Sequence, residues 1–102
     1  MQRGELYRYA LRGTRERTVL LVAAQHVLDD SRYTMLYAIE VTADDPQHLL
    51  AIPVTVGTEQ GWLDVARDLV RAYRGALVES YGQLPDEQLD RVDLALRAVL
   101  DL

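Results

Sequence analysis

The chain has 102 residues, with 16 Asp and Glu against 11 Lys and Arg, so its net charge is −5 and its pI lies near 4.8. An acidic chain cannot bind nucleic acid through a broadly basic surface, so any contact with RNA or DNA must be local. Cysteine is absent, which excludes disulfides and cysteine-ligated zinc. The composition, 49 % apolar and 26 % charged without a linker or repeat, predicts one domain over residues 1–102.

The N-terminal residues lack the apolar core of a signal peptide, and the sequence contains no apolar run of the roughly 20 residues that span a bilayer. We therefore expect a cytoplasmic protein that does not bind membranes.

The first half of the chain has the pattern of a β protein. Strands are expected over residues 5–11, 18–24, 33–42 and 48–56. The nearly unbroken apolar run Thr18–Ala24 is typical of a central strand that is buried on both faces. Pro53 has no N–H group, so the strand that contains it should lie at an edge of the sheet or at a bulge.

The segment from residue 62 to residue 77 is ambiguous. Its apolar side chains recur at helical spacing, which by periodicity alone predicts an amphipathic helix. These side chains are Trp62, Val65, Ala66, Leu69, Val70, Tyr73 and Leu77. The composition does not decide between helix and strand here.

The C-terminal segment predicts a helix of about four turns. Pro85 fits the first helical position, and Asp86 and Glu87 place negative charge in the first turn. One face then carries an apolar stripe from Leu89 to Leu100, and the opposite, charged face is expected to be solvated.

Familiar catalytic and cofactor motifs are absent from the sequence. It lacks the glycine patterns of dinucleotide and phosphate-binding loops, the zinc motif His-Glu-x-x-His and the nucleophile motif Gly-x-Ser-x-Gly. His26 and His48 are the only histidines, and they are too far apart in the sequence, without a cluster of a third ligand type near either, for a metal site to be expected.

The arginines are the remaining candidates for a functional site. Arg12, Arg15 and Arg17 crowd the segment before the apolar strand and form the densest cationic spot in the sequence. Guanidinium groups fork onto phosphates and stack on bases, so a phosphate-binding patch is chemically sensible. The alternative is that these arginines belong to a solvated loop and only aid solubility.

The order of the segments resembles the MazF/PemK family of bacterial toxins, which are related in fold to CcdB. The likeness rests on Arg3-Gly4-Glu5-Leu6-Tyr7, on an arginine directly before the apolar Val-Leu-Leu-Val strand, and on Gln83-Leu84-Pro85-Asp86-Glu87 entering a helix. The resemblance implies an α+β, mainly β fold: a strongly bent antiparallel sheet, SH3-like in its barrel, with a C-terminal α-helix, in a twofold dimer. It also implies a strand over residues 65–72 and a single helical turn over 74–77, against the periodicity.

The resemblance implies the toxin of a type II toxin–antitoxin system, an endoribonuclease that cleaves single-stranded mRNA without metal or other cofactor and is blocked by a cognate antitoxin. Arg17 matches the family arginine that stabilises the transition state. The Ser or Thr that ends the next long strand corresponds to Glu40, or to Thr42 if two residues are inserted, and these two share a face. Glu40 is a general base, a group that repels the phosphate, or only a charged residue on the solvent face of a strand. The arginines expected to bind substrate are Arg12, Arg15, Arg67 and Arg71.

The sequence departs from the family pattern in ways that leave an alternative open. Thr18 follows Arg17 where the family has proline, and Asp68-Leu69-Val70 replaces a Gln-hydrophobic-Arg pattern. The alternative is a catalytically degenerate module that binds an antitoxin or another protein. Inhibition of gyrase is disfavoured because the Trp-Gly-Ile tail of CcdB-like proteins is missing.

A homodimer is expected under both hypotheses, because the chain has more ring and aliphatic surface than one small barrel can hide. The side chains behind this expectation are Tyr7, Tyr9, Tyr37, Trp62 and the C-terminal apolar stripe.

Overall fold

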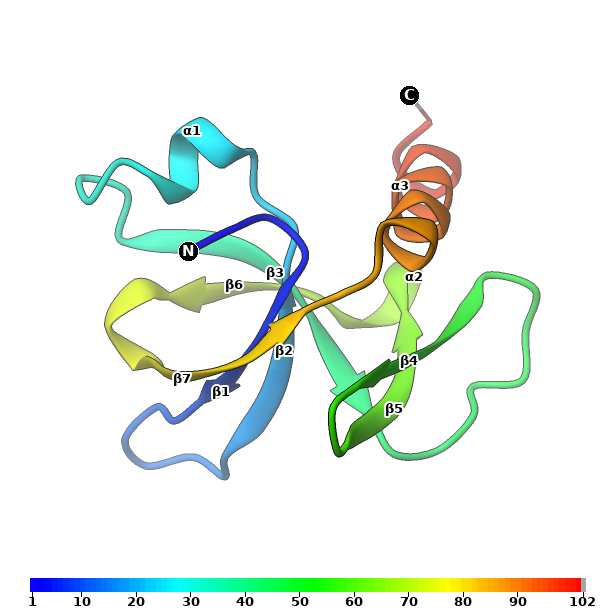
Figure 1. Ribbon diagram of the computed structural model, residues 1–102, viewed down its shortest axis with the longest axis horizontal. Coiled ribbons are helices and arrows are strands. Elements are labelled where there is room, and N and C mark those ends of the chain that lie inside the picture. The colour runs from blue at the N-terminus through cyan, green and yellow to red at the C-terminus, as the bar shows by residue number, and fades with distance from the viewer. Residues whose placement is uncertain (102) are drawn as a thin grey trace.

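The computed structural model describes residues 1–101, in which a strongly curled antiparallel sheet carries a short helix over residues 25–28 and the C-terminal helix at one end (Figure 1). The strands are β1 (Glu5–Tyr9), β2 (Arg17–Leu21), β3 (Met35–Thr42), β4 (Ala51–Val56), β5 (Glu59–Asp64), β6 (Leu69–Tyr73) and β7 (Leu77–Gln83). The helices are α1 (Gln25–Leu28), α2 (Val65–Asp68), the 3₁₀ turn η1 (Arg74–Ala76) and α3 (Asp86–Leu100). The predicted fold class, mainly β with a bent antiparallel sheet and a C-terminal helix, is confirmed.

Strand β3 organises the sheet. The strand order is β4-β5-β3-β2-β1-β7, and β6 pairs with β3 beside β5. One edge of β3 pairs with β2, whereas the other edge pairs with β6 over residues 35–39 and with β5 over residues 41–42. The two ends of β3 therefore belong to different parts of the curled sheet.

Strand β2 is buried on both faces, as its apolar run predicts. Val19 and Leu21 belong to one hydrophobic cluster, whereas Leu20 and Val22 belong to another. The expected strand over residues 18–24 is nevertheless too long. Strand β2 ends at Leu21, and the chain leaves the sheet to enter α1, a short helix that the pattern did not predict.

Helix α3 covers the cluster that contains Leu20, and it buries Val92 and Ala95 there. The predicted helix and its apolar stripe are confirmed. Pro85 is the N-cap residue rather than the first helical residue. Among residues 1–101, the helices are too short or too polar to cross a membrane.

The helix that periodicity predicts over residues 62–77 is wrong. The segment is divided among the end of β5, α2, β6 and η1. The strand and helical turn implied by the resemblance are confirmed for β6 and η1, but residues 65–68 form one helical turn instead of a strand. The cause is local: Asp64 caps this turn by accepting a hydrogen bond from the Arg67 backbone N–H at 3.2 Å.

The strand expected over residues 48–56 begins only at Ala51. Before it, the backbone N–H of Leu50 donates to the His48 ring, so this stretch is a turn. Pro53 lies on β4 opposite Trp62 of β5, and β4 is at the end of the strand order, as predicted for a strand with proline.

Candidate active site

Arg17 stands at the first position of β2, on the face of the sheet that carries the cluster around Leu21. The register pairs Tyr9 of β1 with Arg17, and Glu40 of β3 with Val19. Residues opposite each other in an antiparallel pair share a face, and so do residues two apart along a strand. Arg17, Tyr9 and Glu40 therefore lie on one face, with Arg17 two residues beyond the last pair of the β2–β3 ladder, Val19 and Glu40.

The guanidinium of Arg17 has neighbours but few bonds. Its Nη1 lies 3.6 Å from Oε2 of Glu40, which is an ion-pair distance longer than a hydrogen bond. Its Cζ lies 5.3 Å from the centre of the Tyr9 ring, within the range of a cation–π contact. The buried Nε has no hydrogen-bond partner among the described residues. Arg17 thus holds a positive charge in place while its N–H donors stay open.

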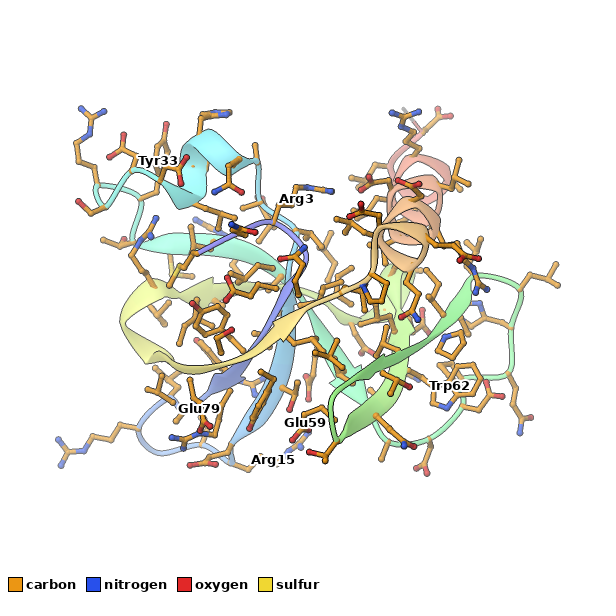
Figure 2. All side chains as sticks on the ribbon, viewed as in Figure 1. Arg3, Arg15, Tyr33, Glu59, Trp62 and Glu79 are labelled. Atoms are coloured by element: carbon orange, nitrogen blue, oxygen red, sulfur yellow. The ribbon has the colours of Figure 1, made fainter. Side chains whose placement is uncertain are left out.

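Glu40 is clamped between two arginines. Its Oε1 accepts a hydrogen bond from Nη2 of Arg15 at 3.1 Å, and its other oxygen faces Arg17. The Glu40 side chain is only 16 % exposed, whereas that of Arg15 is 79 % exposed. Figure 2 shows Arg15 at the same end of the molecule as Glu59 and Glu79. The structure therefore brings together Arg15, Arg17 and Glu40, all three of which the sequence indicates as site residues.

Thr42 lies at the end of β3. Its Oγ1 is 3.3 Å from the carbonyl oxygen of Asp44 and 3.4 Å from that of Trp62, so the hydroxyl is directed to the backbone. By side-chain contact, Glu40 and not Thr42 is the partner of Arg17.

Arg67 lies on helix α2, and its carboxylate partners are Asp68 and Asp64. It pairs with Asp68 through two hydrogen bonds of 3.0 and 2.9 Å. These bonds raise the pKa of Arg67, and the charges of Asp64 and Glu40 add to the rise. A strand over residues 65–72 would have turned Arg67 and Arg71 to the same face. The helical turn separates them.

The structure does not bring Arg12 and Arg71 to Arg17. Arg12 is exposed in the β1–β2 loop, beside an open depression that Tyr73 also lines. Arg71 is exposed opposite Tyr37 on the other face of the β3–β6 pair from Ala38 and therefore from Glu40.

A His48–Asp64 pair holds the loop before β4 to the end of β5, and sequence reasoning missed it. Nε2 of His48 lies 2.8 Å from Oδ2 of Asp64, and Nδ1 accepts the Leu50 N–H at 3.1 Å. Burial alone would raise the pKa of Asp64, but hydrogen bonds from His48 and from the Arg67 N–H outweigh burial and hold this pKa below its usual value. The Asp-x-x-Arg spacing at residue 64 could have indicated the capped turn, whereas nothing in the sequence indicates His48.

Residues 1–101 contain no group of three or more His, Asp or Glu side chains placed to hold a metal ion. The groups that the structure brings together at the candidate site are the guanidinium groups of Arg15 and Arg17 and the carboxylate of Glu40.

Known proteins resemble this chain in structure and not in sequence. The sequence matches neither a protein-family model nor a curated protein. Among solved structures, a mycobacterial endoribonuclease in complex with its cognate antitoxin superposes with a TM-score of 0.85 at 17 % identity, covering 100 % of this chain and 96 % of that one. MazF from a MazE–MazF complex of Deinococcus radiodurans superposes with a TM-score of 0.80 at 16 % identity, again over 100 % and 96 % of the two chains.

The chain has the MazF fold. A second mycobacterial endoribonuclease, with a TM-score of 0.82 at 16 % identity, covers 100 % of this chain and 92 % of its own. The fold implied by the N-terminal and C-terminal motifs is thus confirmed over the whole chain. In this MazF fold, Glu40 pairs with Val19 at the end of the β2–β3 ladder, and Arg17 lies two residues before Val19 on β2.

Proposed function

We propose that this protein is the toxin of a type II toxin–antitoxin pair, an endoribonuclease that cleaves single-stranded mRNA without metal or other cofactor. The observation that carries the proposal is the Arg17 guanidinium, held at the start of β2 of a MazF fold beside Glu40, with its side chain 25 % exposed and its Nη1 3.6 Å from the carboxylate. A guanidinium with unpaired N–H donors can stabilise the negative charge that develops on a phosphate in the transition state.

The proposed reaction uses the RNA as its own nucleophile. Glu40 accepts the proton of a ribose 2′-hydroxyl, and the 2′-oxygen then bonds to the adjacent phosphorus. Arg17 donates hydrogen bonds to the non-bridging oxygens as their charge grows. The bond from phosphorus to the 5′-oxygen breaks, this oxygen takes a proton from water, and the resulting hydroxide takes the proton that Glu40 had accepted. The products are a 2′,3′-cyclic phosphate and a 5′-hydroxyl end.

Further contacts with RNA are assigned to the neighbouring arginines. Arg15 pairs with Glu40 and would bind a phosphate next to the cleaved one, and Arg67 on helix α2 would bind a phosphate farther along the RNA. Arg12 is exposed in the adjoining loop and would meet the strand farther along. Arg71 faces the other side of the sheet and has no place in this proposal, and Thr42 enters it only as a neighbour of the reacting groups.

The proposed partners are a cognate antitoxin and a second copy of the chain, in the cytoplasm where mRNA is present. The solved structures with the same fold include complexes with an antitoxin. Surface apolar side chains support a homodimer: Tyr37 is 55 % exposed, and Leu94 and Leu100 are also exposed. Tyr9 does not contribute to such an interface, because it is buried inside the barrel.

Cleavage of a mixture of unstructured RNAs in the presence of EDTA tests the proposal. We expect the wild-type protein to cleave and Arg17→Ala to cleave at least about 100-fold more slowly. Arg71→Ala is the matched control, because it removes an exposed arginine from the other face and should cleave normally. Wild-type protein that neither cleaves RNA nor arrests bacterial growth would leave the degenerate binding module as the function.

Glu40→Gln decides what the carboxylate does. If Glu40 is the general base, this isosteric change abolishes cleavage while RNA binding is kept or strengthened. Faster cleavage would show instead that Glu40 repels the phosphate.

Sedimentation of the protein at tens of micromolar tests the proposed homodimer, and a species of only 11.6 kDa would contradict it.

A further inference from the structure

Tyr9 connects the candidate active site to the interior of the barrel. It is the last residue of β1 and is 4 % exposed, and its register partners are Arg17 on β2 and Leu77 on β7. Small residues, Ala38 and Ala72, belong to the same buried cluster, which leaves room for a large ring.

The hydroxyl of Tyr9 anchors this ring to a third strand. The backbone N–H of Tyr73 on β6 donates to Oη of Tyr9 at 3.1 Å. Strand β6 pairs with β3 on one edge and with no strand on the other edge among residues 1–101. The tyrosine hydroxyl therefore accepts a backbone hydrogen that would otherwise lack a partner on that edge, and this bond fixes the far end of the ring.

One face of the anchored ring is turned to Arg17. The 5.3 Å from the ring centre to Cζ is within the distance at which a guanidinium is attracted to an aromatic face. The other restraint on Arg17 is Glu40, whose carboxylate stays 3.6 Å from Nη1. A guanidinium without the ring would be free to turn and form a short, bidentate pair with Glu40, which would occupy both the cation and the carboxylate.

We propose that Tyr9 is a positioning residue for Arg17: its ring holds the guanidinium beside Glu40 without letting the two close into a hydrogen-bonded pair. The ring thereby keeps the N–H donors of Arg17 available for a phosphate. This role rests on the proposed ribonuclease function, which it deepens by naming what keeps the cation ready.

The test compares Tyr9→Phe, which keeps the ring, with Tyr9→Leu, which removes it. Tyr7→Leu is the matched control, because Tyr7 is half-buried on the same strand and face but does not lie over Arg17. We expect Tyr9→Leu to lower kcat about tenfold with little change in KM, Tyr9→Phe to stay within about twofold of wild type, and Tyr7→Leu to keep its kcat. Equal losses of kcat in the Phe and Leu variants would overturn the proposal.

A readout that needs no cleavage separates this inference from the proposed function. The Arg17 Nε–H resonance should be shifted upfield by the ring current in wild type and in Tyr9→Phe, and should lose that shift in Tyr9→Leu. If wild type cleaves no RNA, the ribonuclease proposal fails while this resonance still decides whether Tyr9 positions Arg17. An Nε–H resonance that is the same in all three proteins would overturn the positioning role.

Fluorinated phenylalanines at position 9 keep the test valid if Tyr9→Leu does not fold. Each added fluorine weakens the negative potential of the ring face while the shape of the side chain hardly changes. We expect kcat to fall stepwise with the number of fluorines, as attraction between the ring and the guanidinium weakens. A kcat that is independent of fluorination would show that the ring serves only as packing.

Discussion

Two arginines in this protein have the same side chain and opposite surroundings. The guanidinium of Arg17 has an open Nε–H and one distant carboxylate, whereas that of Arg74 is surrounded by acceptors. Arg74 donates to the backbone carbonyls of Val27, Leu28, Asp30 and Tyr33 at 2.9 to 3.0 Å. All eleven basic side chains of the chain are arginines, so residue type alone cannot distinguish the two roles.

The difference shows how to separate an arginine that builds the fold from one that can act on a ligand. Arg74 satisfies the carbonyls at the end of α1 and in the loop after it, so its donors are already used. Arg17 is fixed by a ring face and a charge, which leave its N–H groups unused. Mutations can test each side of this contrast.

The largest expected effect is on cleavage, in Arg17→Met. Removing the cation should slow RNA cleavage at least about 100-fold, while the free energy of unfolding falls by no more than about 1 kcal/mol, because only a cation–π contact and a long ion pair are lost. Cleavage assays and urea unfolding on the same preparation measure both quantities. A loss of stability as large as that of Arg74→Met would mean that Arg17 also belongs to the fold.

Arg74→Met should produce the reverse pattern. Several carbonyls lose a charged donor at once, and because water can reach some of them, we expect the unfolding free energy to fall by about 2–3 kcal/mol. Urea unfolding measures this loss, and Arg71→Met is the control with an exposed side chain and little expected change. Unchanged stability in Arg74→Met would remove the contrast between the two arginines.

Asp64→Asn tests a third polar site, the His48–Asp64 pair, and its effect should be about 1 kcal/mol at pH 7. The pKa of Asp64 is lowered in the folded state, so its carboxylate stabilises the fold above the unfolded value of about 3.9, and this contribution is lost as the pH falls through the folded value. The difference between wild type and Asp64→Asn should therefore shrink below about pH 4. Unfolding curves at pH 7, 5 and 3 measure it, and Asp90→Asn on the exposed face of α3 is the control. A difference that stays constant with pH would contradict the role assigned to the charge.

The smallest effect is expected for Arg67→Gln. Arg67 is 56 % exposed, so its pair with Asp68 should add little to stability. If Arg67 contacts a phosphate, its removal should weaken binding of a non-cleavable RNA modestly and reduce the salt dependence of that binding by about one ion. Binding titrations at several salt concentrations measure this slope, and an unchanged slope would exclude Arg67 from the RNA path.

The sequence predicts the elements whose signals are continuous. The apolar run of β2 indicates burial on two faces, and the stripe of α3 is long enough to be read without ambiguity. Helical periodicity predicts the wrong structure for the segment after Gly61, because β5, α2 and β6 are each only four to six residues long. A helical spacing that arises across three short elements imitates the period of one long helix.

The sequence predicts which residues belong to the candidate site, but it does not predict the contacts between them. Arg17 and Glu40 can be named from motif and spacing, but their separation depends on the register of β2 with β3. The part played by Tyr9 depends on β6 lying within reach of its hydroxyl, 64 residues farther along the chain. A local pattern carries no information about such a contact, nor about the one between His48 and Asp64.

Pro53 on the outermost strand has a consequence for how copies of this protein can meet. Strand β4 presents a free edge, but the proline ring interrupts its row of donors in the middle. A neighbouring chain that tried to add a strand along this edge would find no N–H group at its centre and a rigid ring in its way. Pro53 thus disfavours edge-to-edge pairing of β4 with a strand of a neighbouring molecule, which would otherwise allow association to continue beyond the expected dimer.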